Sequence, residues 1–148
     1  IITIFFNMQT INGNIIRDIL SKQNRIYLSG NLNRNQPFEH IKTSDLEIGI
    51  SNYQDFTSDM PHEHIWNNEY NIILQGEIKV YIFNEHMEYI FHKDDLFLIE
   101  PNMQYIVKAN KDTQVLFIKS PGGNDKKLLP ITPAIEQWMQ TWENKMNY

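Results

Sequence analysis

Two histidines and a glutamate lie close together near the middle of the chain, in the segment PHEHIWNNEYNIILQG that covers residues 61–76. His62 and His64 are one residue apart, so on an extended strand both side chains point to the same side. Glu69 follows five positions later, and its carboxylate can reach that side from the next strand. Two imidazoles and a carboxylate are a mixed nitrogen and oxygen donor set that suits a divalent transition metal such as Fe, Mn, Ni, Zn or Cu. For the histidine pair alone, surface histidines in a turn are the competing interpretation.

Residues 62–76 resemble the first conserved motif of the cupins, H-x-H-x(3,4)-E-x(6)-G. Its fixed positions are occupied by His62, His64, Glu69 and Gly76. Phe56 stands where the family usually has a glycine, which serves a turn and not the metal. The resemblance covers about residues 45–120. It implies a small β-barrel that holds one divalent metal through the two histidines and the glutamate.

The second cupin motif, G-x(5)-P-x-G-x(2)-H-x(3)-N, is recognisable by position only. It should fall at residues 94–109, and Pro101 supplies its proline one place late. The substituted positions are Asp94 and Asn102 for glycine, Glu100 for proline and Ala109 for asparagine. Tyr105 stands at the position of the fourth metal ligand, which is a histidine in the family. The second motif therefore does not identify a fourth metal ligand in this chain.

Three interpretations of Tyr105 remain open. It is a phenolate ligand whose pKa, ordinarily near 10, is lowered by the metal. Alternatively, it is a neutral phenol beside a three-ligand metal, where it donates a hydrogen bond or acts as a general acid or base. In the third interpretation the metal site is lost and Tyr105 only packs. We favour the second, in which open metal positions remain for a substrate or O₂ and Tyr105 is the catalytic residue.

Aromatic and amide residues surround these motifs and are candidates for an amphipathic ligand pocket in the barrel. The predicted pocket residues are Trp66, Asn68, Tyr81, Phe97 and Met103. Trp66 and Asn68 are expected at the rim, on the turn between the ligand strands. Packing in the core is the competing interpretation for each of them.

The composition is that of an ordinary globular chain of 148 residues, 41% hydrophobic and 12% aromatic. A chain of this length forms one domain and buries about two-thirds of its unfolded surface. The net charge of −5 argues against a nucleic-acid interface. The apolar opening IITIFF is far shorter than the roughly 20 residues of a membrane span and does not resemble a signal peptide. We therefore expect no membrane partner and a cytoplasmic location. The first methionine is Met8, so the sequence leaves open whether residues 1–7 belong to the native chain or are an upstream extension of it.

From residue 60 on, turn signals recur at short intervals, which favours an all-β barrel or sandwich. In residues 77–84 the aliphatic side chains alternate with Lys79, Tyr81 and Phe83, which face the other way. Residues 96–100, with the sequence LFLIE, are predicted to form an apolar core strand.

A short helix is predicted on each side of this strand-rich part. Residues 14–24 carry an apolar stripe at helical spacing, with Asn12 or Asn14 as the cap. Near the chain end, Thr132 is placed to cap a helix and Pro133 to begin it. The stripe of this second helix consists of Ile135, Trp138, Met139, Trp142 and Met146. The two tryptophan side chains present too much apolar surface to remain exposed to solvent, so we expect this helix to pack on the barrel or on a partner subunit.

The expected fold is therefore all-β: a small antiparallel β-barrel of the cupin or jelly-roll type with a short N-terminal helix and a C-terminal amphipathic helix. Residues 1–44 form an N-terminal extension with the helix and an edge strand. Residues 45–120 form the barrel core, and residues 121–148 form a PGG loop and the last helix. Together they make one domain.

Two classes of function fit this fold and donor set. In the first, a metal-binding cupin holds a small polar organic ligand and catalyses a metal-dependent oxygenase, lyase or isomerase reaction. In the second, a non-catalytic cupin binds or senses a small, sugar-like molecule, with or without a metal. The cofactor is one divalent transition metal (Fe, Mn, Ni or Zn). The resemblance to cupins also implies a homodimer.

Overall fold

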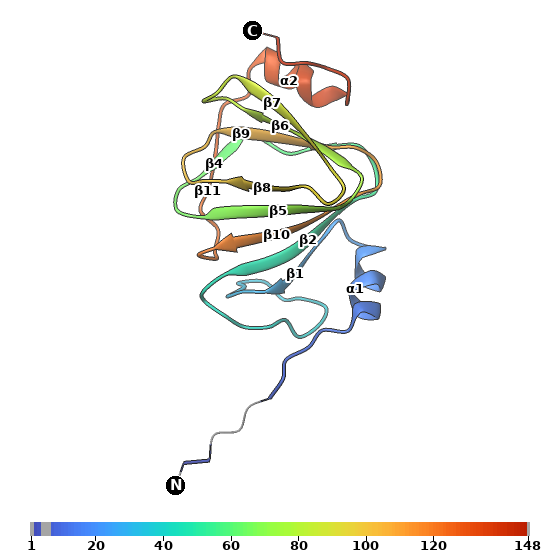
Figure 1. Ribbon diagram of the computed structural model, residues 1–148, viewed down its shortest axis with the longest axis vertical. Helices are drawn as coiled ribbons and strands as arrows, with labels where there is room; N and C mark the ends of the chain where they lie inside the picture. The colour runs from blue at the N-terminus through green and yellow to red at the C-terminus, as the bar shows by residue number, and fades with distance from the viewer. Residues whose placement is uncertain (1, 4–6, 148) are drawn as a thin grey trace.

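The computed structural model describes residues 2–3 and 7–147 and shows two antiparallel β-sheets packed face to face, with two short helices outside them (Figure 1). The helices are α1 (Gly13–Leu20) and α2 (Pro133–Gln140). The first sheet contains, in spatial order, β1 (Arg25–Ser29), β2 (Glu47–Tyr53), β10 (Thr113–Ser120), β5 (Asn68–Gln75) and β8 (Leu96–Ile99). The second contains β11 (Lys126–Leu128), β4 (His62–His64), β9 (Tyr105–Ala109), β6 (Glu77–Ile82) and β7 (Met87–His92), with β3 (Thr57–Ser58) beside β9.

This arrangement confirms the predicted all-β jelly roll with a helix near each end of the chain. Strand pairing runs along each sheet separately, so the expected barrel takes the form of two facing sheets. No helix among the described residues has the length and apolar character needed to cross a membrane. Most of the opening IITIFF segment, residues 1 and 4–6, lies outside the described residues.

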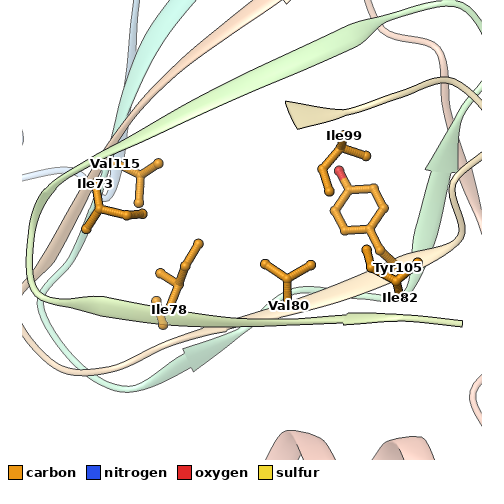
Figure 2. Close-up of a cluster of buried hydrophobic side chains, with 8 residues drawn as sticks. Ile73, Ile78, Val80, Ile82, Ile99, Tyr105 and Val115 are labelled. Carbon is orange, nitrogen blue, oxygen red and sulfur yellow. The ribbon is translucent and has the colours of Figure 1, made fainter. Parts of the chain in front are cut away.

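The core between the sheets follows from the alternation of side chains along the strands. On β6, Ile78, Val80 and Ile82 point inward, as their spacing predicts, and meet Ile73 of the facing sheet. Figure 2 shows the ring of Tyr105 among these aliphatic side chains, with its hydroxyl pointing away from its own strand. This hydroxyl is therefore a polar group held against the aliphatic core.

The opposite face of the second sheet is covered by α2. Tyr81 and Ile106 point outward from β6 and β9 and pack against Ile135 and Trp138 of the helix. The helix begins as predicted, with the Thr132 side chain accepting a hydrogen bond from a backbone N–H of the first turn. This helix therefore packs on its own sheet, one of the two positions expected from its apolar stripe.

Lys108 fixes the chain beyond α2. Its ammonium donates to the carbonyl oxygens of Trp138, Thr141 and Asn144 at 2.8 to 2.9 Å and lies 4.1 Å from the centre of the Trp138 ring. These contacts hold the chain end in a turn, so the helix stops at Gln140 and does not extend through Trp142 as the stripe predicts. β9 thus carries Tyr105 on its inner side and Lys108 on its outer side.

The strand predicted at residues 96–100 is present as β8, and its inner side chains Phe97 and Ile99 pack in the core, but its other face is not buried. β8 is the last strand of the first sheet, and its outer face is open to solvent, with Leu96 61% exposed. The apolar side chains there continue across the sheet in two rows of paired residues. The rows are Leu98–Tyr70–Ile118–Ile48 and Leu96–Ile72–Leu116–Ile50. α1 packs over the β1 end of this sheet, against Ile26 and Ile50.

Candidate functional site

Four side chains from three strands converge on one point between the sheets. His62 and His64 lie on β4, Tyr105 on β9 and Glu69 on β5 of the facing sheet. The Tyr105 hydroxyl oxygen is 2.8 Å from His62 Nε2, 3.1 Å from His64 Nε2 and 2.9 Å from Glu69 Oε2. His64 Nε2 is also 3.1 Å from Glu69 Oε2. We refer to these four residues as the His–Glu–Tyr cluster.

The outer nitrogen of each imidazole is held by an acceptor. His62 Nδ1 is 2.7 Å from the carbonyl oxygen of Met60, which can only accept, so this nitrogen carries a proton. His64 Nδ1 is 2.7 Å from Oδ1 of the buried Asp125 carboxylate and donates to it in the same way. In its neutral form each ring therefore directs the Nε2 lone pair inward. Metal-binding histidines are characteristically oriented by such partners.

Asp125 is a site residue that the sequence did not indicate. It lies in the loop between β10 and β11, and its Oδ2 accepts the backbone N–H groups of Trp66 and Asn67, each at 2.8 Å. These two bonds and the bond to His64 fully engage the carboxylate and lower its pKa against the opposing effect of burial. No spacing rule connects Asp125 to a histidine 61 positions earlier.

The charges in the cluster are set by burial and by these contacts. Burial lowers the pKa of His62 from 6.5 to about 4, so the ring is neutral at pH 7. Burial also acts to lower the pKa of His64, but the carboxylates of Glu69 and Asp125 outweigh it and raise that pKa. The pKa of Glu69 falls to about 2 because His64 outweighs the effect of burial. Burial and Glu69 raise the pKa of Tyr105 well above 10, so its phenol is neutral.

In the state in which both histidines are neutral, the cluster has too few hydrogens for its acceptors. With both rings neutral, the only hydrogen inside it is the Tyr105 O–H, and it faces two imidazole lone pairs and one carboxylate oxygen. An unsatisfied buried acceptor costs about 1 to 3 kcal/mol. One further cation removes the deficit, either a proton on His64 or a metal ion.

The donor set was tested for its fit to a metal ion. In ligand type, inward lone pairs and outer hydrogen-bond partners, His62, His64 and Glu69 fit a divalent transition metal. Among the described residues, however, no group of three or more His, Cys, Asp or Glu side chains is close enough to hold a metal by itself. The atom that the two histidines and the glutamate share is the Tyr105 hydroxyl oxygen.

A cavity opens from the cluster into the space between the sheets. About 60 Å³ of it is open to the centres of water-sized molecules, whereas one buried water needs roughly 10 to 15 Å³ by the same measure. The apolar part of its lining is Phe97, Ile78, Val107, Val115 and Phe117. The polar part is Ser51, Tyr53, Asn71, Asp59, Arg25, Lys119 and Lys126, besides the cluster.

Of the five predicted pocket residues, only Phe97 is among those that line this cavity. Trp66 lies on the turn between β4 and β5 and is 52% exposed. Asn68 precedes the inward-facing Glu69 on β5 and so faces the other way. Tyr81 packs under α2, and Met103 packs at the edge of the core, where its sulfur accepts the backbone N–H of Glu100. These four are replaced in the cavity lining by residues such as Arg25 and Lys119.

All three stretches of the chain that the sequence distinguished contribute to the site. Arg25 comes from the N-terminal extension, the cluster from the barrel core, and Asp125 and Lys126 from the C-terminal part. From the sequence, Arg25 and Arg34 could bind an anionic ligand, but the commoner interpretation is a solvated surface arginine, and Lys126 has no distinguishing signal.

Comparison with known proteins supports the resemblance to cupins. Residues 52–119 match the family model described as the cupin domain, and these residues contain β3 to β9 and most of β10. Together with the jelly roll and the first-motif residues inside it, this match supports a single-domain cupin. A search of curated proteins found no match.

Solved structures share the fold at low sequence identity. KdgF from Halomonas sp. has a TM-score of 0.51 and 21% identity over 56% of this chain and 74% of KdgF. A double-stranded β-helix protein from Klebsiella pneumoniae has a TM-score of 0.53 and 15% identity, over 66% of this chain and 90% of its own. A structure from work on the DMSP lyases RdDddP and RnDddQII has a TM-score of 0.57 and 15% identity, over 72% of this chain and 52% of its own. At these identities the likeness shows the fold alone.

Proposed function

We propose that this cupin binds one divalent first-row transition metal (Fe, Mn, Ni or Zn) through His62, His64 and Glu69, and a small polar organic ligand in the adjoining cavity. The observation that carries the proposal is the convergence of His62 Nε2, His64 Nε2 and Glu69 Oε2, all within 2.8 to 3.1 Å of the Tyr105 hydroxyl oxygen. When both rings are neutral, two inward lone pairs and a carboxylate share the single hydrogen of Tyr105. A divalent cation at this point satisfies all of these acceptors.

The residues of the cluster suit proton transfer to or from a ligand. A bound metal would act as a Lewis acid on a carbonyl or hydroxyl oxygen of the ligand. Tyr105 keeps its proton at neutral pH, because burial and Glu69 raise its pKa, and holds that proton at an atom facing the metal ligands. Asp125 fixes the orientation of His64. We therefore favour a lyase or isomerase reaction with Tyr105 as the proton donor or base; an oxygenase is compatible with the same ligands.

A non-catalytic binding protein without metal is the alternative. It is favoured by the position of the Tyr105 hydroxyl between the metal ligands, and by the raised pKa of His64. A proton on His64 supplies the missing hydrogen, so the cluster is also satisfied in a metal-free protein. In that case the cavity binds or senses a small molecule with no chemical step.

Metal content separates the two. The protein is expressed with added Fe, Mn, Ni and Zn in turn, purified, and analysed by elemental analysis beside the variants His64→Ala and His92→Ala. We expect about one metal per chain in the wild type and in His92→Ala, whose imidazole is exposed, and loss of metal in His64→Ala with the fold retained by circular dichroism. No stoichiometric metal in the wild type under any supplement rejects the metal site.

Turnover distinguishes an enzyme from a binding protein once the metal is known. The loaded protein is tested on carbonyl, sugar and aromatic compounds, with product detected by mass spectrometry. A ligand that binds tightly and is recovered unchanged with every metal favours the binding protein.

We also propose that the chain forms a homodimer through the outer face of β5 and β8. On this face Leu96, Tyr70 and Leu98 are 61%, 40% and 36% exposed, and an identical patch on a second copy is their matching partner. Light scattering after gel filtration should give twice the 17.6 kDa chain mass, and Leu96→Lys should give the single-chain mass. Met87→Lys, at an exposed position of the other sheet, is the control. A monomeric wild type rejects the dimer.

The cytoplasmic location stays a prediction.

A further inference from the structure

Arg25 lies at the end of the cavity formed by the first sheet and is held there by polar and aromatic neighbours. Its Nε donates to the hydroxyl of Ser51 at 2.9 Å, and its guanidinium carbon is 5.5 Å from the centre of the Phe117 ring. Ser51 is directly paired with Arg25 across β1 and β2. The guanidinium is therefore oriented by the sheet itself and is not a freely moving surface group.

No carboxylate contacts this guanidinium. Among the described residues, no Asp or Glu oxygen lies within 4.0 Å of Arg25, and Asp59, which lines the same cavity, acts on it only at longer range. Lys119, the other cation on the first sheet's side of the cavity, is 3.4 Å from Glu47 and is thereby paired. A guanidinium carries a planar fork of N–H donors, of which Nε donates to Ser51 and one terminal nitrogen lies 3.4 Å from the Tyr53 hydroxyl oxygen. The N–H groups that these two contacts leave over are available to a ligand.

The same arginine also faces the route to solvent. A second, wider depression shares Arg25, Tyr53 and Asp59 with the cavity and is bounded by the loop of residues 34–37. Arg34 lies in it, 4.6 Å above the ring of Tyr27. The entrance therefore carries two arginines against one aspartate, although the whole chain has a net charge of −5. A local positive field of this kind raises the concentration of anions at the entrance.

We propose that the ligand of this cavity is a small carboxylate, whose carboxylate group is bound by Arg25 while its other polar group faces the His–Glu–Tyr cluster. The proposal rests on the proposed function, because it names the class of ligand for the same site. A carboxylate matches the guanidinium fork in shape and charge, and such bonds are about twice as strong as bonds between neutral groups. The narrow cavity limits the ligand to a few non-hydrogen atoms beyond its carboxylate.

Pairs of acids and their amides test this directly. Binding of acetate, propionate, lactate and succinate is measured by titration calorimetry at fixed ionic strength, beside acetamide, propionamide, lactamide and succinamide, and inorganic phosphate serves as a second anion. The proteins are the wild type, Arg25→Gln, Arg25→Lys and Arg17→Gln. Arg17 is an exposed arginine of α1 that does not line the cavity, so its variant is the matched control.

We expect at least one acid to bind the wild type and Arg17→Gln at least tenfold more tightly than its amide. Arg25→Gln should remove this preference, and Arg25→Lys, which keeps the charge but not the fork, should retain part of it. Metal content and the urea unfolding midpoint are measured for each variant, so that a folding defect is recognised.

The carboxylate proposal is overturned if acid and amide bind equally, or if folded Arg25→Gln keeps the wild-type preference. It is also overturned if no acid binds, or if phosphate binds more tightly than every acid. Metal content is measured independently of these titrations. A protein that holds its metal but fails them retains the proposed metal site, and one that passes them without metal retains the carboxylate site alone.

Discussion

Asp125 Oδ1 lies 2.7 Å from His64 Nδ1, although the two residues are 61 positions apart. The carboxylate is anchored by the N–H groups of Trp66 and Asn67, which follow the histidine on the same turn. One side chain therefore fixes both the orientation of His64 and the turn that leads to Glu69. This makes the loop before β11 part of the site.

Removing the charge of Asp125 should weaken metal binding. In Asp125→Asn the amide no longer favours a proton on His64 Nδ1, and we expect the metal affinity to fall by about 10- to 100-fold. Competition with a chromophoric chelator measures this change. Asp55→Asn, at an exposed position away from the cluster, should match the wild type. An Asp125→Asn protein with wild-type affinity would show that the carboxylate has only a structural role.

The variant Tyr105→Phe distinguishes a neutral phenol from a phenolate ligand. If Tyr105 is a neutral donor, we expect the metal content to be unchanged and turnover to be lost. The metal-free protein should also be destabilised by about 1 to 3 kcal/mol, because Glu69 and His62 lose the hydrogen of the Tyr105 hydroxyl. Urea unfolding with and without metal measures the last effect. Loss of metal from a folded Tyr105→Phe protein would instead identify Tyr105 as a ligand.

The metal-free protein should lose stability as the pH falls from 6.5 to 4. Because burial lowers the pKa of His62 to about 4, the unfolded chain binds more protons than the folded chain in this window, and the free energy of unfolding decreases with decreasing pH. Glu69, with its pKa lowered from 4.5 to about 2, extends the loss to more acidic conditions. His64 has a raised pKa and acts in the opposite sense, with stability that is lost as the pH rises through its folded pKa.

Urea unfolding at several pH values in this window measures the dependence. His62→Gln should have a smaller slope between pH 6.5 and 4, and His92→Gln, at an exposed position, should keep the wild-type slope. Equal slopes for wild type and His62→Gln would show that His62 is not the titrating group.

Replacing Lys108 should release the chain end. In Lys108→Met the carbonyl groups of Trp138, Thr141 and Asn144 lose their common donor, and we expect a destabilisation on the order of 2 kcal/mol. Hydrogen exchange should become faster in residues 133–147 and remain slow in β5. Lys93→Met, on an exposed turn, is the control. Unchanged protection of residues 133–147 would mean that apolar packing alone holds α2.

Local patterns in the sequence predicted the parts of the fold that depend on neighbouring residues. The side chains of β6 alternate as predicted, and the cap of α2 is the predicted Thr132. The alternation in β6 also predicts that Tyr81 faces away from Ile78 and Val80 and therefore lies on the other side of the sheet. The prediction of Tyr81 in the pocket disregarded that alternation.

The rest of the site depends on contacts between distant parts of the chain. Arg25 and Asp125 reach the cavity because β1 and the loop before β11 lie at the ends of the two sheets, and no local spacing encodes that proximity. The strand β8 was predicted, but its open outer face was not, because a run of apolar residues is the same in a fully buried strand and in a strand with one open face. The metal ligands themselves stay a prediction from the first cupin motif, with a geometry that brings them to one oxygen atom.

β9 presents a phenol to the cavity and, three residues later, an ammonium to the chain end on its other side. The short strand therefore connects the cavity on one side of the sheet with the chain end on the other side. Removal of the tail would leave the outer side of the strand that carries Tyr105 without the three carbonyl groups that Lys108 now bonds.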